Sequence, residues 1–282
     1  MRHLTHKVRF LGLVAIATLA AVWPVAAQAA ATAPSLGSAG NFAVLSAAPN
    51  GGGAVTCTNG TINGNVGSSG ARASVVQTSC PITGSITAPV SAQVVADFNT
   101  AYAAYAAIPC GTTLTGTLAG VSLAPGVYCF TAAATLTGTL HLTGSGPWIF
   151  KVGTSGTGAL TGTGFTVVTS NPCNVNWWVA QAATMTDSNF AGTILAGAAI
   201  TLTRGTFTGN ALATAGVTIT GTALTGCAGV KGHEGDEDKD THCNQGVGNG
   251  PEGCDPGNSN NHNTSNDENG GVPGDPGRQG RK

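Results

Sequence analysis

The sequence predicts a mainly β solenoid with one long α-helix beside it. Two kinds of segment predict the solenoid: a recurring phrase in which a large apolar residue stands between small or hydroxylated residues, and several runs that are apolar at nearly every position. A third segment, 89–107, has apolar residues at helical spacing. Alternation has the period of a strand, with the apolar residue facing the core and its neighbours facing out.

The recurring phrase returns at intervals that fit one solenoid coil. Its apolar centres are 24, 25, 17 and 17 residues apart in Thr135-Leu136-Thr137, Ala159-Leu160-Thr161, Thr184-Met185-Thr186, Thr201-Leu202-Thr203 and Thr218-Ile219-Thr220. Stacked coils would align the outward threonines into ladders, with Ala159 and Arg204 expected as interruptions. The candidate binding residues are Thr135, Thr137, Thr161, Thr184, Thr186, Thr201, Thr203, Thr218 and Thr220.

The chain before these phrases predicts irregular coils and then a helix. Short strand-like runs at 41–45, 61–66 and 82–86 are separated by Gly, Ser and Asn turns. Residues 89–107 begin at a proline, stop before Pro109, and carry an apolar stripe at three- and four-residue spacing. The stripe consists of Val94, Val95, Phe98, Ala101, Tyr102 and Tyr105.

Two further sets of strands are predicted within the repeats. The runs 148–152, 177–180, 193–196 and 211–213 are apolar at nearly every position, as expected for strands buried on both faces. We therefore expect the helix to cover this column. A third set, at 140–142, 165–168 and 207–208, would complete a three-sided coil and leave the threonine face bare.

The first residues resemble a secretory signal, which predicts an exported, extracellular protein. Basic residues at Arg2, Lys7 and Arg9 precede an apolar run, and Ala27-Gln28-Ala29 supplies small residues for cleavage. An uncleaved membrane anchor is the alternative, although the run is short for a transmembrane helix. We expect a signal peptide at 1–29, a solenoid domain at 30–229 with its helix at about 89–107, no membrane association after cleavage, and a polar tail at 230–282. The tail has too few large apolar residues to offset the entropy of folding.

Eight cysteines in an exported chain indicate disulfide bonds. Sequence spacing favours Cys57 with Cys80, Cys110 with Cys129, Cys173 with Cys227 and Cys243 with Cys254. Eight cysteines allow 105 complete pairings, so nearest-neighbour pairing remains one choice among several. The chain has no closely spaced Cys-x-x-Cys, and this argues against zinc.

Charge is almost absent between residues 31 and 230. This segment holds only Arg72, Asp97, Lys151, Asp187 and Arg204, whereas the residues from Lys231 onward hold ten of the twelve acids. Binding to nucleic acid requires clustered Lys and Arg. We therefore expect no nucleic-acid partner.

The same scarcity argues against catalysis and against a cofactor or metal. The acids available to the folded region are Asp97 and Asp187, and His141 is its single histidine, so neither a carboxylate pair nor a Ser-His-Asp triad is indicated. Gly-rich stretches at 51–53 and 156–158 lack the Gly-Lys-Ser/Thr that continues a phosphate loop. The acidic run 236–240 begins like a calcium loop but lacks the required Gly and Glu.

A series of motifs occurs in a fixed order along the chain. They are Leu36-Gly37-Ser38-Ala39-Gly40-Asn41-Phe42-Ala43-Val44-Leu45, Ile62-Asn63-Gly64-Asn65-Val66-Gly67, Pro125-Gly126-Val127-Tyr128, Trp148-Ile149-Phe150, Asn174-Val175-Asn176-Trp177-Trp178-Val179, Phe190-Ala191-Gly192-Thr193-Ile194-Leu195-Ala196 and Ile200-Thr201-Leu202. Together these motifs resemble the microbial ice-binding protein family. The resemblance implies a right-handed, discontinuous β-helix of triangular cross-section with one long α-helix packed along one face. In such a fold the first coils and the last strand lie side by side.

The resemblance also implies that one flat, uncovered face adsorbs to an ice crystal surface. The chain departs from the family in its cysteine number, in its polar tail and at Asn210-Ala211, where an Arg-Leu pair is common. We expect a monomeric antifreeze protein that is not an enzyme and that gives thermal hysteresis and inhibits ice recrystallisation. Threonine also favours strands in solenoids of other functions. An extracellular adhesin or matrix protein is therefore the alternative, and a carbohydrate-active enzyme is a more distant third.

Overall fold

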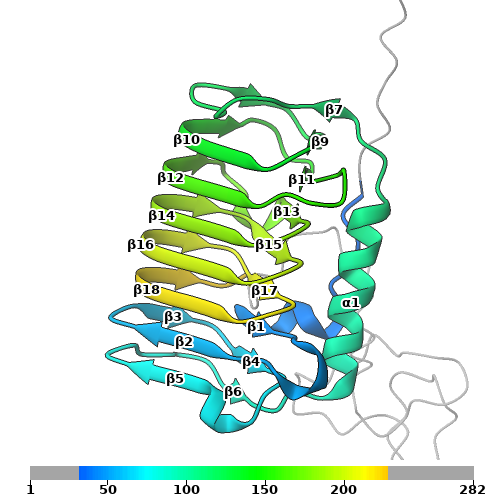
Figure 1. Cartoon of the computed structure of the whole chain (residues 1–282). Coiled ribbons are helices and arrows are strands. Elements are labelled where there is room, and N and C mark those ends of the chain that lie inside the picture. The colour runs from blue at the N-terminus through cyan, green and yellow to red at the C-terminus, as the bar shows by residue number, and fades with distance from the viewer. Residues whose placement is uncertain (1–31, 228–282) are drawn as a thin grey trace, which may run out of the picture.

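Parallel strands stack as the coils of a solenoid, and one helix lies along its side (Figure 1). The computed structural model describes residues 32–227. One side of the stack is a nine-stranded sheet in the order β6 (Ile86–Thr87), β4 (Val66–Ser68), β1 (Val44–Ser46), β17 (Ala211–Ala213), β15 (Thr193–Ala196), β13 (Val175–Val179), β11 (Trp148–Val152), β9 (Gly126–Phe130) and β7 (Thr112–Thr113).

The remaining strands form a second sheet that bends around a corner. Its order is β5 (Val75–Thr78), β2 (Val55–Thr58), β18 (Val217–Thr225), β16 (Ile200–Thr208), β14 (Ala183–Ala191), β12 (Leu160–Val168), β10 (Ala134–Leu142) and β8 (Ser122–Leu123), with β3 (Thr61–Asn63) also paired to β18. The five nine-residue strands of this sheet each bend near the middle. Their second halves, with β3, form the third side of the coil, where the sequence places residues 140–142, 165–168 and 207–208.

The order of coils in space differs from their order in the chain, as expected. The last long strand, β18, pairs with β2, so that Thr218 lies beside Thr56, and β17 pairs with β1, so that Leu212 lies beside Leu45. The early coils thus continue the stack below the last coil (Figure 1). The mainly β, discontinuous solenoid predicted from the sequence is confirmed.

Large aromatic residues fill the interior of the stack. Trp148, Phe150, Trp177 and Phe165 are fully buried, and the rings of Phe150 and Trp177 stack with centroids 4.0 Å apart. Aromatic pairs of this kind stabilise a core beyond the area that they bury. Successive coils therefore share one continuous core.

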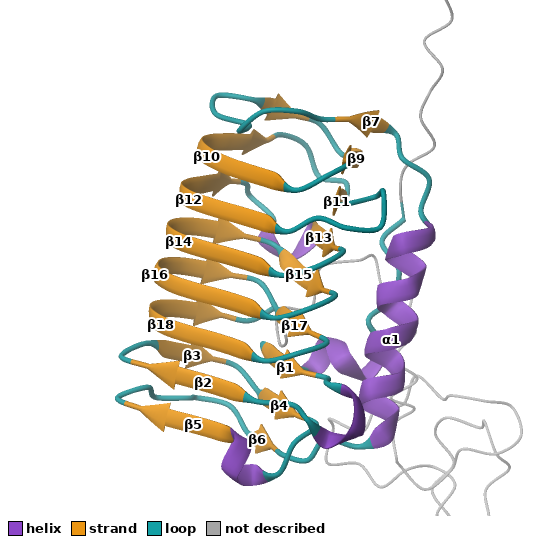
Figure 2. Cartoon of the chain, in the orientation of Figure 1, coloured by secondary structure: helices purple, strands orange, loops and turns teal. Residues whose placement is uncertain are grey.

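The helix α1 (Ala92–Ala107) covers the outer face of the first sheet, as predicted (Figure 2). It begins at Ala92 instead of residue 89, because the Ser91 side chain accepts a hydrogen bond from the Val94 amide and caps the helix there. Along the helix, Phe98, Ala101 and Tyr105 are buried against outward residues of the sheet. These sheet residues are Leu45, Ile149, Trp178, Leu195 and Leu212.

Two charged side chains form hydrogen bonds that hold this helix in place. Lys151, buried on β11, donates from Nζ to the Ala106 carbonyl at 2.8 Å and to that of Ile108, at the carboxyl end of the helix. A cation there compensates carbonyl groups that have no partner within the helix. Asp97 accepts hydrogen bonds from the Ser38 amide and hydroxyl and from Gln93, and so holds the short helix η1 (Gly37–Asn41) against α1.

Three disulfide bonds connect coils at the predicted pairs. They join Cys57 to Cys80, Cys110 to Cys129 and Cys173 to Cys227, with Cα separations of 5.8, 6.0 and 5.6 Å. The predicted Cys243–Cys254 pair, the signal segment and the polar tail lie outside the described residues. Three 3-10 helices, η2 (Pro49–Gly51), η3 (Arg72–Ser74) and η4 (Pro172–Asn174), occupy turns. No helix within residues 32–227 has the length and apolar character needed to cross a bilayer.

Replacing Lys151 by Met should loosen the docked helix. The variant keeps an unbranched apolar stem but removes the donor to two carbonyl groups at the helix end, so we expect unfolding free energy to fall by about 1–3 kcal/mol. Urea unfolding measures this. Arg72→Met, at an exposed cation away from the helix, is the matched control and should cost less; equal losses would contradict a specific role for Lys151.

Asp97 predicts a pH-dependent contribution to stability. Hydrogen bonds from Ser38 and Gln93 lower the pKa of its carboxyl below the ordinary 3.8. A lowered pKa in the folded state stabilises the fold above the unfolded pKa, and the contribution is lost as pH falls through the folded pKa. We expect Asp97→Asn to lower the melting temperature at neutral pH, and the gap from wild type to shrink below pH 3.8. A gap that is constant across this range would refute the prediction.

Candidate functional site

Outward threonines of the second sheet align in two parallel columns, which we call the threonine array. The first column runs Thr135, Thr161, Thr184, Thr201, Thr218, Thr56 and Val76. The second column runs Thr137, Thr163, Thr186, Thr203, Thr220, Thr58 and Thr78, with Thr137 at a local shift in register. All nine candidate threonines from the sequence therefore lie together on one face.

One coil of the array has a register different from the one that the sequence suggested. Leu160 pairs with Ala134 and Ala183, so the inward position that corresponds to Leu136 and Met185 is occupied by Gly162. A Cβ atom on Gly162 would lie 2.5 Å from the Met185 sulfur, which shows that the neighbouring side chain fills this space. The outward pair of the coil is accordingly Thr161 and Thr163.

In this register neither Ala159 nor Arg204 interrupts the array, so the expectation from the sequence was wrong. Ala159 precedes β12 and accepts a backbone hydrogen bond from Ala134, so it occupies no position in either column. Arg204 follows Thr203 at the bend of its strand, outside the array. Thirteen of the fourteen positions are therefore threonine, and the exception, Val76, is also β-branched.

Five array positions are not among the residues predicted from the sequence: Thr56, Thr58, Val76, Thr78 and Thr163. A signal for two of them was present, because Thr56-Cys57-Thr58 has the recurring phrase with cysteine as the buried centre. The coil of β5 carried no such signal, since Gln77 occupies its central position. Thr163 carried no signal either, because Gly162 stands where the recurring phrase has a large apolar residue.

A left-handed backbone residue follows the second column in every coil of the array. These residues are Gly138, Gly164, Asp187, Arg204, Gly221, Asn59 and Ser79, with φ between 50° and 71°. The left-handed conformation turns the chain sharply from the array to the third side. Each second-column side chain therefore stands at the same distance from a corner, which keeps the column straight.

The array is open to solvent and free of charge. Every member is partly or fully exposed, and α1 packs on the first sheet instead (Figure 2). Within residues 32–227, none of the thirteen array hydroxyls makes a hydrogen bond to another protein group, so all can bond to solvent. The neighbouring backbone amides and carbonyls are already paired in the sheet.

The spacing of the array follows from β geometry. Outward residues two apart on a strand are separated by about 6.6–6.8 Å, and adjacent coils by about 4.7–4.9 Å. Threonine side chains have a restricted χ1, so their methyl and hydroxyl groups form a nearly fixed two-dimensional pattern. The surface presents a repeating arrangement of apolar and hydrogen-bonding groups to water.

The third side is also uncovered, contrary to the expectation of a single bare face. Its first column is mixed: Thr139, Thr166, Asn189, Thr206, Ala223 and Thr61. The Thr206 hydroxyl donates to the Asn189 side chain at 3.0 Å and is therefore used within the protein. Regularity, rather than exposure alone, distinguishes the array from the third side.

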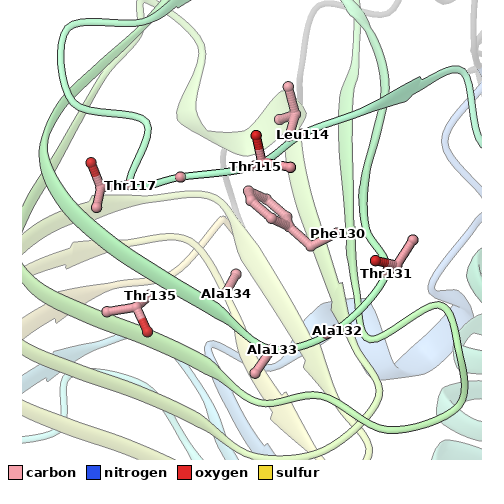
Figure 3. A pocket seen from close by; sticks show the side chains of 10 residues that line it. Leu114, Thr115, Thr117, Phe130, Thr131, Ala132, Ala133, Ala134 and Thr135 are labelled. Atoms are coloured by element: carbon pink, nitrogen blue, oxygen red, sulfur yellow. The ribbon is translucent and has the colours of Figure 1, made fainter.

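A pocket of about 440 Å³ lies at one end of the stack and has no catalytic groups (Figure 3). Segments 114–117 and 130–135 line it, and the Phe130 ring points into it. Its walls carry threonine hydroxyls and apolar groups, without a titratable side chain. Among residues 32–227, no cluster of His, Cys, Asp and Glu is suited to hold a metal ion.

Comparison with known proteins agrees with this fold. An ice-binding protein from Nostoc sp. (strain HG1) is 35% identical over 182 residues, which span 61% of this chain and 65% of the relative. The crystal structure of an ice-binding protein from an Antarctic biological consortium superposes with a TM-score of 0.62 at 28% identity, covering 71% of this chain and 93% of the other. The crystal structure of an ice-binding protein from the Antarctic ascomycete Antarctomyces psychrotrophicus superposes with a TM-score of 0.60 at 29% identity, covering 69% of this chain and 98% of the other.

A family model gives the family to which the chain belongs. A family model described as ice-binding-like matches residues 47–225, which is well over half of the 282-residue chain. This segment contains every residue of the threonine array together with the helix. The chain belongs to the ice-binding-like family.

Proposed function

We propose that this chain is an exported, non-enzymatic protein that adsorbs to ice through the threonine array. The observation that carries the proposal is the register: thirteen threonines and one valine repeat over seven coils on an uncovered, uncharged surface. Membership of the ice-binding-like family supports ice as the partner. The signal-like residues at 1–29 and the three disulfides support export and an extracellular location.

Adsorption requires the array to share water with the crystal. The threonine methyl groups order nearby water, while the free hydroxyls hydrogen-bond to it, so that the ordered layer merges with the ice surface. The array is rigid because its side chains are β-branched and its inner strands are hydrogen-bonded to a neighbour on both sides, and little conformational entropy is lost on binding.

Bound protein would then act on crystal growth. Ice advancing between adsorbed molecules becomes curved, which lowers the temperature at which growth continues and slows the exchange of water between crystals. These effects are measured as thermal hysteresis and as inhibition of recrystallisation. A monomer without a cofactor or a membrane partner is sufficient for this action, and we propose that state.

The central test places bulky groups in the array. Thr186→Tyr with Thr203→Tyr should abolish most thermal hysteresis, because each ring projects above the flat surface at its middle coils. Unfolding free energy should change by no more than about 0.5 kcal/mol for such surface positions. Matched changes on the third side, Thr206→Tyr with Thr225→Tyr, should leave the hysteresis unchanged.

Two results would oppose the proposal. A folded wild-type chain without thermal hysteresis would favour the alternative, an extracellular adhesin or matrix protein with the solenoid as a spacer. Loss of activity in the third-side variant, with activity retained in the array variant, would move the ice-contacting surface around the corner.

Removing the polar tail tests whether the array is sufficient. All array residues lie between Thr56 and Thr220, so a chain that ends at Gly229 should retain the thermal hysteresis of the full chain at equal molar concentration. A large decrease, in a truncated chain whose circular dichroism and melting temperature are unchanged, would assign a role in ice binding to residues 230–282.

A further inference from the structure

An ion pair occupies the corner beside the middle of the threonine array. Arg204 contacts Asp187 with both ends of its guanidinium group, from Nε to Oδ1 at 2.5 Å and from Nη2 to Oδ2 at 2.8 Å. We call these two residues the corner pair. They follow Thr186 and Thr203 directly in the chain, on β14 and β16, the third and fourth of the seven array coils.

Both residues of the corner pair have an unfavourable backbone conformation. Their φ angles are 51° and 57°, in the left-handed region. At the same corner, Gly138, Gly164 and Gly221 turn three of the other coils, and the small polar residues Asn59 and Ser79 turn the remaining two. Left-handed backbone is costly for residues with a Cβ atom, and a bulky side chain such as arginine is uncommon there. Strain that persists where glycine would serve points to a role for the side chains.

A contribution to folding stability does not explain why these two residues are present. The side chains of Arg204 and Asp187 are 61% and 51% exposed, and exposed ion pairs contribute little to folding because water screens them. The corner is in any case held by the backbone pairing of β14 with β16 on both sides of the bend. Glycine at either position would therefore be tolerated by the fold.

The position of the pair suggests an effect on the array instead. The pKa of Asp187 is lowered and that of Arg204 is raised, chiefly by their mutual hydrogen bonds, so both stay charged. The stem of Arg204 also runs past the next corner, since its Cγ lies 3.5 Å from where a Cβ of Gly221 would be. The other charged residues of 32–227 lie elsewhere: Asp97 and Lys151 are on the helix side, and Arg72 is in η3, where it donates to the Val75 carbonyl at the start of the outermost strand β5.

We propose that the corner pair keeps the rim of the ice-contacting surface electrically neutral and is a specificity-determining part of that surface. An isolated carboxylate or guanidinium beside Thr186 or Thr203 would hold its own hydration shell and disturb the ordered water over the array. Paired with two hydrogen bonds, each charge satisfies the other, and the water layer joins the crystal. The inference rests on the proposed function.

Four variants test the coupling between the two charges. Arg204→Gly removes strain and leaves Asp187 unpaired, so we expect an unchanged or higher melting temperature but a clear loss of thermal hysteresis. Asp187→Gly should do the same by leaving Arg204 unpaired. The double variant Asp187→Gly/Arg204→Gly should recover the hysteresis lost in the single variants. The exchange Asp187→Arg/Arg204→Asp, which restores a pair of opposite polarity, should also recover it.

The pattern of results separates this inference from the proposed function. If both single variants match the wild type, or the double variant is as weak as the singles, the neutral-rim role is wrong. If either result is found while Thr186→Tyr/Thr203→Tyr abolishes hysteresis, the proposed function stands without the neutral-rim role. Hysteresis that survives the two tyrosines would overturn both.

Discussion

Parallel hydrogen bonding between coils keeps each outward side chain beside its counterpart on the next coil. The pairs Thr184 with Thr201 and Thr201 with Thr218 show this register over three successive coils. Because residues two apart on one strand point to the same face, a single pairing between two strands fixes both columns of the array. The core, the corner and the exposed surface are consequences of that register.

The interior supports the register from within. Stacked rings such as Phe150 with Trp177, and Phe190 with Phe207, pack each coil against the next at residues that the backbone pairing also places side by side. Where the core departs from this pattern, it compensates locally, as Met185 does beside Gly162. Core packing and backbone pairing therefore support the same register.

The faces of the solenoid differ in what covers them. The first sheet is apolar on both sides and is covered by α1, which also buries Lys151 against its carboxyl end. The array needs no such cover because its outward groups hydrogen-bond to water, and its low charge leaves that water free to order. The absence of charge that argues against catalysis thus supports adsorption to a neutral crystal, and the corner pair places the nearest charges in mutual contact.

The sequence by itself determined the local features of this protein: alternation, the helix and the apolar column beneath it. These follow from periodicity and spacing, which short stretches of chain express completely. Tertiary structure decided which strands became neighbours, since the pairing of β18 with β2 joins residues more than 150 positions apart. It thereby added Thr56, Thr58, Val76 and Thr78 to the array, placed Gly162 inside and Thr163 outside, and moved Arg204 from the ladder to the corner. Register between coils depends on packing and backbone pairing across the whole stack, and no single segment of the sequence contains that information.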